Sequence, residues 1–198
     1  MINAIIFDLG RVLIDFDFRI AVERLKKRCS VDMFKLLSFF GAHSPAKDFD
    51  RGMIDEKEFF TKIQEEMNFP ISMEEFIGFW NEIFTEKKEM VALAKSFKGK
   101  YKVGILSNTN AWHVAHLKRK HAWVFQFDAF VGSCDVKLMK PDPEIYKLTL
   151  KKLGVKPEEA FYTDDIAENI VAAKKLGMDA VQFKGYEPLM VEVKKRGL

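Results

Sequence analysis

Short apolar segments that alternate with amphipathic helices constrain the fold of this chain more than any other feature. Strands buried on both faces of a parallel sheet are continuous apolar runs, and helices connect such strands by crossing over the sheet. The pattern therefore predicts an α/β fold, with a parallel sheet that carries helices on both faces. The segments of strand length cover residues 3–7, 103–106, 130–131, 160–163 and 180–183.

The helices between these strands have recognisable ends. The helix expected over residues 143–153 follows Asp142 as its N-cap, has Pro143 at its first position and stops at Gly154. This placing of the three residue types is typical of a helix start and end. Helical periodicity also covers residues 89–97, 112–120 and 166–176.

A long helical stretch separates the first strand from the others. Residues 18–86 show helical spacing of their apolar side chains, and no clear strand interrupts them. Asp55 precedes Glu58, and Ser72 precedes Glu75, with the spacing of a capping box at a helix start. This stretch is therefore predicted to be an all-helical insertion after the first strand.

The composition changes at the same boundary. Residues 16–86 hold 12 of the 19 phenylalanines and carry 10 basic against 14 acidic side chains, whereas the remainder carries 22 against 15. Aromatic side chains at helical spacing usually form a core. We predict a core formed by residues 1–15 and 87–198 and a helical cap formed by residues 16–86. The basic balance of the core suits an anionic ligand.

The overall composition, with 48% hydrophobic and 31% charged residues, is that of a soluble globular protein. No apolar run reaches the roughly 18 residues that span a membrane, and Asp8 interrupts the first apolar run before a signal-peptide core could form. We expect a cytoplasmic monomer or homodimer without a membrane partner. The net charge of +3 gives no reason to expect nucleic acid. Cys29 and Cys134 form no CxxC motif and are expected to be reduced and buried.

Polar residues cluster where the predicted strands end or where their connections return to the sheet. In open parallel sheets, ligands bind outside the carboxyl ends of the strands, so these side chains are expected to converge on one edge. The set contains carboxylates, a hydroxyl, an amide and a lysine. Its members are Asp8, Ser107, Asn108, Lys140, Asp164 and Asp165.

This set of residues favours phosphate chemistry. Three carboxylates beside a lysine repel one another unless a cation lies among them, and oxygen ligands of this kind suit Mg²⁺, which also binds phosphate oxygens. Lys140 and Ser107 would hold the remaining oxygens of a phosphate. Asp8 could then attack phosphorus and form an aspartyl-phosphate. We predict a Mg²⁺-dependent phosphatase acting on a small phosphorylated metabolite.

Four segments resemble the ordered motifs of the haloacid dehalogenase-like (HAD) hydrolase superfamily. The resemblance implies a Rossmann-like core, and the helical insertion is similar in position and length to the C1 cap of that family. The opening Phe-Asp-Leu-Gly and the second motif Ser-Asn-Thr-Asn also resemble the bacterial alpha-D-glucose-1-phosphate phosphatase group. The segments are Phe7-Asp8-Leu9-Gly10-Arg11-Val12-Leu13, Leu106-Ser107-Asn108, Lys140-Pro141-Asp142-Pro143-Glu144-Ile145-Tyr146 and Tyr162-Thr163-Asp164-Asp165.

The resemblance implies a role for each matching residue in catalysis and phosphate binding. It makes Asp8 the nucleophile. Ser107 and Asn108 match the phosphate-binding motif, and Lys140 matches the lysine that orients the phosphate.

The same resemblance implies a set of metal ligands. Asp8 and the backbone carbonyl of Gly10 would contribute from the first motif, and Asp164 and Asp165 match the metal-binding acids of the last motif. Of these two acids, we expect Asp165 to coordinate the metal directly.

Gly10 departs from the family pattern. Most phosphatases of the superfamily have a second aspartate there, whose side chain protonates the leaving oxygen. Loss of general acid catalysis typically costs ~10²- to 10⁴-fold in rate, and least where the leaving group needs no proton. We therefore expect a good leaving group, such as that of a sugar 1-phosphate or an acyl phosphate. Asp15 and Asp17 are expected at the hinge into the cap rather than as replacement acids.

Two other functions stay open. A haloacid dehalogenase would use the same nucleophile on carbon without a metal, although the Asp164-Asp165 pair argues against it because no cation would offset the acids. A non-catalytic phosphate-binding protein would explain Gly10 as a sign of lost activity. Loss of turnover with EDTA separates the phosphatase from the dehalogenase, and binding without turnover favours the non-catalytic protein.

Side chains where cap and core meet allow two interpretations, lining of the pocket mouth or packing in the core, and their helical spacing favours packing. These residues are Phe39, Phe40, His43 and Trp112. His113 and His116 share a helix face, but no cysteine or further carboxylate stands at a matching spacing, so a zinc site is not expected.

Overall fold

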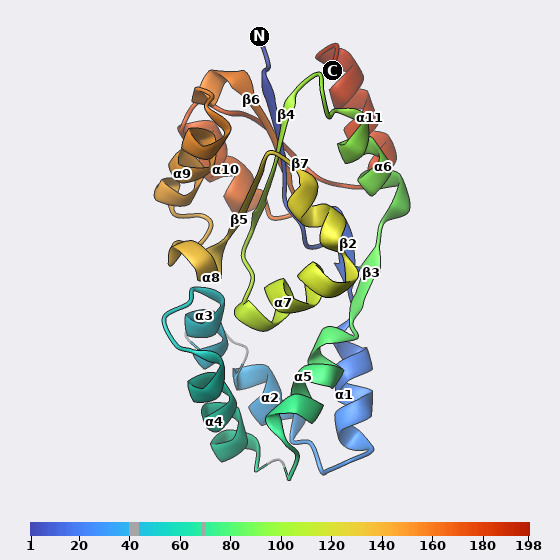
Figure 1. Cartoon of the computed structure of the whole chain (residues 1–198), viewed down its shortest axis with the longest axis vertical. Helices are drawn as coiled ribbons and strands as arrows, with labels where there is room; N and C mark the ends of the chain where they lie inside the picture. Colours follow the sequence, from blue (N-terminus) through green and yellow to red (C-terminus); the bar gives the residue numbers. More distant parts are fainter. Residues whose placement is uncertain (40–43, 69) are drawn as a thin grey trace.

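The computed structural model describes residues 1–39, 44–68 and 70–198. At its centre is a parallel sheet of five strands in the order β5-β4-β1-β6-β7, which confirms the predicted α/β fold (Figure 1). Because β1 lies in the middle, the chain extends the sheet first to one side and then to the other, so the carboxyl end of β1 lies at the topological switch point. The strands are β1 (Ala4–Phe7), β4 (Lys102–Ser107), β5 (Ala129–Gly132), β6 (Ala160–Asp164) and β7 (Asp179–Gln182).

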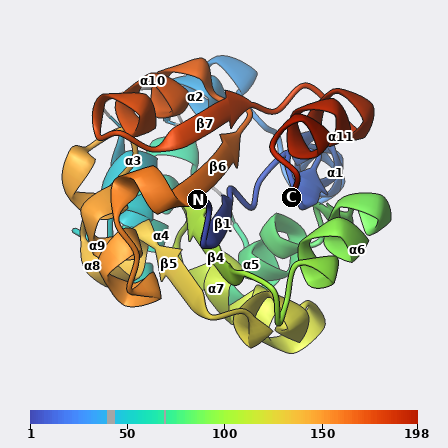
Figure 2. The ribbon, with the colours of Figure 1, turned by 90° about the horizontal axis from the view of Figure 1, so that it is seen from above.

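Helices cover both faces of the sheet, with α6 and α11 on one face and α9 and α10 on the other (Figure 2). The side chains of β1 show why: Ile5 and Phe7 belong to one apolar core, and Ala4 and Ile6 belong to the core on the opposite face. A strand whose two faces are both buried is apolar throughout. The helices of this part are α6 (Lys88–Ser96), α7 (Ala111–Lys120), α8 (Ser133–Val136), α9 (Pro143–Leu153), α10 (Ala167–Lys175) and α11 (Tyr186–Lys195).

A second group of helices lies at the end of the sheet toward which the strands point (Figure 1). The two predicted helix caps are present, since Asp55 accepts from the N–H of Glu58 at 2.8 Å and Ser72 accepts from the N–H of Glu75 at 3.1 Å. We propose that this group is the cap. Its helices are α1 (Phe18–Lys26), α2 (Met33–Phe39), α3 (Pro45–Asp50), α4 (Glu56–Met67) and α5 (Met73–Asn81).

A two-stranded antiparallel ribbon joins these helices to the sheet. It consists of β2 (Ile14–Phe16) and β3 (Phe84–Glu86), with Ile14 opposite Glu86. The prediction that no strand interrupts residues 18–86 was wrong at this point. Strands of three residues are too short to show alternation, and the partner of β3 lies far away in the sequence. The ribbon therefore holds side by side the two segments that connect the sheet with the proposed cap.

The helix α7 packs against the cap helices as well as near the sheet. Its Trp112 is 1% exposed, and the ring lies 4.9 Å from the ring of Phe49 on α3. Phe39 belongs to the same apolar cluster, so the packing interpretation is confirmed for Phe39 and Trp112. Phe40 and His43 lie outside the described residues. This aromatic cluster ties the cap to the core.

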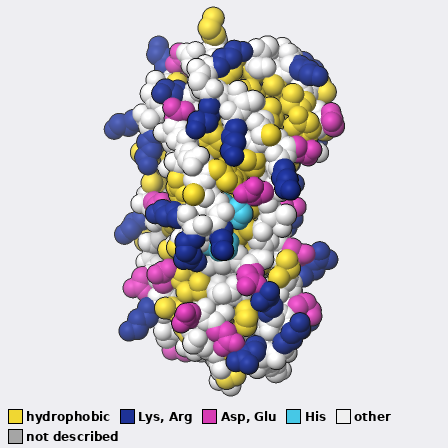
Figure 3. Space-filling model, turned by 45° about the vertical axis from the view of Figure 1, so that its right-hand side comes forward, with side chains coloured by type: hydrophobic (Ala, Val, Ile, Leu, Met, Phe, Trp, Pro, Cys, Tyr) yellow, Lys and Arg dark blue, Asp and Glu magenta, His cyan; other side chains and the backbone are white. Residues whose placement is uncertain are grey.

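The surface carries both charge signs. Figure 3 shows Lys and Arg side chains intermixed with Asp and Glu over the upper and lower parts of the visible face. Cys29 and Cys134 are free thiols, as expected, but each is only partly buried. Among the residues that the structure describes, no helix is both long enough and apolar enough to cross a membrane.

The turn after α3 lies close against α8, which predicts an unusual sensitivity to substitution. Gly52 has a φ of +70°, and a Cβ atom there would lie 2.2 Å from the backbone oxygen of Cys134. Gly154 also has a φ of +70°, but nothing lies within 4 Å of its Cβ position. We expect Gly154→Ala to cost about 1 kcal/mol through its backbone conformation alone, and Gly52→Ala to cost clearly more. Urea unfolding measures both, and equal losses would contradict the contact between α3 and α8.

Candidate active site

The carboxyl ends of β1 and β6 bring three carboxylates together. Asp8 follows β1, Asp164 ends β6, and Asp165 is the next residue. One oxygen atom from each of these side chains lies within 4.8 Å of the others. The two strands are neighbours, and the backbone N–H of Asp8 donates to the carbonyl of Thr163 at 2.9 Å. The structure therefore brings the three predicted acids to one site.

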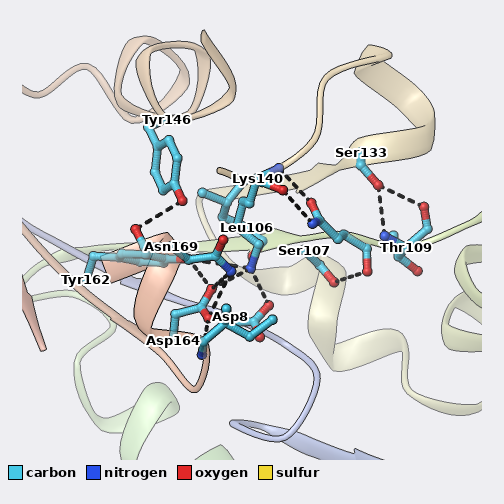
Figure 4. Close-up of polar contacts among 12 residues, drawn as sticks. Asp8, Leu106, Ser107, Thr109, Ser133, Lys140, Tyr146, Tyr162, Asp164 and Asn169 are labelled. Carbon is cyan, nitrogen blue, oxygen red and sulfur yellow. Dashed lines mark hydrogen bonds and ion pairs between the residues drawn. The ribbon is translucent and has the colours of Figure 1, made fainter. Parts of the chain in front are cut away.

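Lys140 lies between two of these carboxylates (Figure 4). Its Nζ donates to Asp8 Oδ1 at 2.7 Å, to Asp164 Oδ2 at 2.6 Å and to the carbonyl of Leu106 at 3.1 Å. An ammonium group has three protons, so these contacts use all of its donors. Because the side chain is only 2% exposed, it is held in one position. Lys140 is thus placed to orient Asp8 as well as to offset its charge.

Asp164 is buried completely and receives hydrogen bonds on both oxygens (Figure 4). Its Oδ1 accepts from the N–H of Ile166 at 2.8 Å, and the amide of Asn169 reaches both oxygens at 3.0 Å. The hydroxyl of Tyr162 and the ammonium of Lys140 reach Oδ2. The roles of Tyr162 and Asn169 were not predicted. They leave Asp164 with little capacity for a further ligand.

The cluster carries more negative than positive charge. Burial raises the pKa of Asp8 to about 7, with Lys140 opposing the rise and Asp164 adding to it. Burial also raises the pKa of Asp165, and the charge of Asp164 adds to that rise. Burial disfavours the charged form of Lys140, but Asp8 and Asp164 outweigh it and raise its pKa. One ammonium cannot offset three carboxylates, so a divalent cation with a preference for oxygen ligands fits this site.

The last residue of β4 and the first residue after it are the predicted phosphate-binding residues Ser107 and Asn108. Ser107 is 4% exposed, and among the described residues its hydroxyl makes only a long contact of 3.5 Å with the carbonyl of Asn108. The side chain of Asn108 bonds to the backbone of Lys140 in both directions, accepting from the N–H at 2.8 Å and donating to the carbonyl at 3.0 Å. The Asn108 amide therefore positions Lys140, whereas the Ser107 hydroxyl is available to a ligand.

Ser133 connects the loop after β4 to the cap and was not predicted. Its Oγ accepts from the N–H of Thr109 at 2.8 Å and donates to the backbone carbonyl of Asp50, at the end of α3, at 2.5 Å. Ser133 directly follows β5, so it occupies a strand end like the other site residues. The sequence signal was missed because the strand was predicted to end at Val131, one residue before its end at Gly132 in the structure.

Gly10 carries no acid, and an aromatic ring lies beside it. A Cβ atom on Gly10 would lie 3.0 Å from Cε1 of Phe16. Asp15 forms an ion pair with Arg11 and is 44% exposed, and Asp17 caps α1 and is 39% exposed. Neither aspartate is among the described residues that line the cavity beside Gly10. These positions fit the prediction that Asp15 and Asp17 lie at the hinge into the proposed cap.

The histidines of α7 do not join a metal site in the structure. Across residues 1–39, 44–68 and 70–198, the three aspartates are the only group of three potential ligands with metal-site spacing. The ring of His113 is stacked on Trp80 and meets Phe84 edge-on, at centroid distances of 6.2 and 4.8 Å. Burial lowers the pKa of His113 to about 3, so its imidazole is neutral.

A parallel sheet with an aspartate at its central strand end, and with a lysine and two more acids beside it, defines a class of hydrolases. The chain matches the model of the haloacid dehalogenase-like hydrolase family over residues 2–177. The chain belongs to this family and is a hydrolase, which confirms the resemblance found in the sequence.

Several relatives within this family are phosphatases. D-ribitol-5-phosphate phosphatase of Bacteroides thetaiotaomicron is 28% identical over 194 residues, which is 92% of each chain. The crystal structure of a HAD family enzyme from the same organism, in complex with magnesium and inorganic phosphate, has a TM-score of 0.83 at 27% identity and covers 93% of this chain and 95% of that one. Fructose-1-phosphate phosphatase of Escherichia coli is 37% identical over 71 residues, 36% of each chain.

Proposed function

We propose that this hydrolase is a Mg²⁺-dependent phosphatase that hydrolyses a small sugar or polyol phosphate through an aspartyl-phosphate on Asp8. The observation that carries the proposal is the group formed by the buried Asp8 and Asp164, which both pair with Lys140, and the partly buried Asp165 beside them. The magnesium and phosphate bound by a relative of similar structure support it, as do the sugar and polyol phosphates named for other relatives.

The residues present suit a magnesium ion. Asp8, Asp165 and the backbone carbonyl of Gly10 would hold it, since the oxygens of Asp164 are occupied by hydrogen bonds. In the described structure, no hydrogen bond from another residue reaches the carboxylate of Asp165. When bound, the ion supplies positive charge that offsets the carboxylates and polarises the phosphate oxygens.

The proposed reaction uses two displacements at phosphorus. Lys140 holds Oδ1 of Asp8 at 2.7 Å, and Oδ2 is the oxygen proposed to attack. The bond from phosphorus to the leaving oxygen breaks as the bond to Asp8 forms, and the Ser107 hydroxyl donates to a phosphate oxygen. Water then attacks phosphorus, which releases inorganic phosphate and restores the carboxylate of Asp8.

The size of the cavity favours a small leaving group. A cavity of about 330 Å³ lies between the sheet end and the cap helices, with Gly10 and Ser107 on one side and Phe49 and Trp80 on the other. This volume is near the lower end of those that bind small ligands. The proposed substrate class is therefore a phosphorylated sugar or polyol.

The proposed function is tested by assaying phosphate release from a panel of sugar, polyol and nucleotide phosphates with Mg²⁺. We expect turnover of sugar or polyol phosphates, complete loss with EDTA and recovery on adding Mg²⁺. Activity that persists in EDTA would contradict a metal-dependent phosphatase. Phosphate and Mg²⁺ binding without any turnover would favour the non-catalytic alternative.

The two neighbouring acids are expected to respond differently to amidation. Asp165→Asn should raise the Mg²⁺ concentration needed for half-maximal activity by at least about tenfold, because it removes a ligand with no other partner. Asp164→Asn should chiefly lower stability, because Lys140 and Tyr162 lose a buried anionic acceptor. Isothermal titration with Mg²⁺ and urea unfolding measure the two effects. If only Asp164→Asn weakened Mg²⁺ binding, Asp164 and not Asp165 would be the metal ligand.

A further inference from the structure

The cavity beside Ser107 and Asn108 is lined by a carboxyl group from the proposed cap, whereas the core has glycine at position 10, where most phosphatases of the family have an acid. Gly10, Ser107 and Asn108 line its floor, and cap residues including Asp50 line its wall. The ionisable side chains among the described lining residues are Lys47, Asp50 and His113. Of these three side chains, only Asp50 carries a carboxyl group, which is the group that position 10 lacks.

The end of α3 is fixed against the loop that follows β4. The Oδ1 atom of Asp50 accepts from Nδ2 of Asn110 at 3.0 Å, and its backbone carbonyl accepts from the hydroxyl of Ser133 at 2.5 Å. The same hydroxyl accepts from the N–H of Thr109, two residues after Ser107. These bonds fix Asp50 beside the loop that follows Ser107, and Asp50 and Ser107 line the same cavity. Within the described structure, its Oδ2 has no hydrogen-bond partner.

The hydrogen bonds of Asn110 also define the state of His113. Oδ1 of Asn110 accepts from the backbone N–H of His113 at 3.1 Å, so Nδ2 is its donor. One Nδ2 proton goes to Asp50, and the other goes to Nδ1 of His113 at 3.3 Å. A neutral ring that accepts at Nδ1 carries its proton on Nε2. This Nε2 is shielded from solvent and has no partner in the part of the chain that the structure describes. It is a free donor beside the cavity.

The protonated form of the Asp50 carboxyl is more favourable in the protein than it would be in water. Burial raises the pKa of the Asp50 carboxyl, while the hydrogen bond from Asn110 and the charge of Lys47 oppose the rise. A carboxyl group that binds a proton more readily is better suited to donate that proton as a general acid.

We propose that Asp50, on the cap, is the general acid that protonates the leaving oxygen of the substrate, in place of a core residue at position 10. As Oδ2 of Asp8 bonds to phosphorus and the ester bond breaks, the leaving oxygen takes the proton of the Asp50 carboxyl and departs as an alcohol. The Asp50 carboxylate takes a proton back from the water that hydrolyses the aspartyl-phosphate. This proposal rests on the proposed phosphatase function.

The proposal changes the expected range of substrates. With an acid on the cap, the enzyme does not require the good leaving group that Gly10 suggested from the sequence. Simple alkyl phosphates, such as the phosphate ester of a primary alcohol in a polyol, become substrates.

The test compares an alkyl phosphate, ribitol 5-phosphate, with p-nitrophenyl phosphate, whose leaving group needs no proton. We expect Asp50→Asn to lower kcat on ribitol 5-phosphate by about 10²-fold or more and to change kcat on p-nitrophenyl phosphate little. Asp48→Asn makes the same chemical change at an exposed position of the same helix and should alter neither rate. Asp50→Ser tests the same point if the asparagine variant does not fold.

Three results would overturn the assignment of Asp50. They are an equal loss on both substrates in a folded Asp50 variant, full retention of alkyl phosphate turnover, and a wild-type enzyme that hydrolyses p-nitrophenyl phosphate but no alkyl phosphate. Failure of the wild-type enzyme on every phosphate ester would instead contradict the proposed function. Rescue of Asp50→Asn by Gly10→Asp, which returns an acid to the core, would support the proposal.

Discussion

Asp8→Asn is expected to lower kcat on every phosphate ester by on the order of 10⁴-fold or more, because an amide oxygen does not form the acyl phosphate that the reaction requires. The variant should stay folded. Lys140 keeps its bond to Asp164 at 2.6 Å, and the amide oxygen can still accept from Nζ. Steady-state kinetics with saturating Mg²⁺ measure the loss.

The control for this prediction is an acidic residue that the site does not use. Asp48→Asn removes one carboxylate from an exposed position on α3 and should retain wild-type activity. Unfolding in urea shows whether the Asp8→Asn protein is as stable as the wild type. If a folded Asp8→Asn protein kept wild-type turnover, the assignment of the nucleophile would be wrong.

Lys140→Met is expected to have the largest effect on stability. Removing the ammonium leaves Asp8 and Asp164 buried close together without a counter-charge, at 7% and 0% exposure. Breaking a buried ion pair by removing one partner typically costs about 3–5 kcal/mol. Urea unfolding in the presence of EDTA measures this loss, and the same variant should be inactive because Asp8 is no longer oriented.

A second substitution separates the charge effect from simple loss of packing. Asp8→Asn in the Lys140→Met background removes one of the two uncompensated carboxylates, so it should restore part of the lost stability. Added Mg²⁺ should do the same for Lys140→Met alone, because the ion supplies the missing positive charge. If neither change restores stability, Lys140 stabilises the fold through contacts other than those with the two acids.

The acids and the lysine of the site could be predicted from the sequence because topology determines their meeting point. Asp8 and Asp164 each end an apolar run, and in a parallel sheet such ends lie on one edge. Lys140 joined this set because it stands just before the predicted helix over residues 143–153, where that connection returns to the sheet, and the resemblance then gave it a role. The helix caps at Asp55 and Ser72 were predictable for a similar reason, because each depends on residues only three positions apart.

Other site residues depend on contacts between distant segments, which no local pattern records. In the sequence, Tyr162 looks like another core residue of a buried strand. Only the structure shows that its hydroxyl donates a hydrogen bond to Asp164. Asp50 is one of many acids in a helical region, and its direction depends on Asn110, sixty residues away. The β2–β3 ribbon was missed because each strand has only three residues and its pairing spans the whole cap.

The proposed mechanism requires a covalent bond between Asp8 and phosphorus. It is tested most directly by quenching the enzyme with acid during turnover of a ³²P-labelled substrate and locating the label by peptide mass spectrometry. We expect a phosphoryl group on the peptide that contains Asp8, with the label lost in Asp8→Asn. Turnover without any labelled enzyme, or a label on another residue, would contradict it.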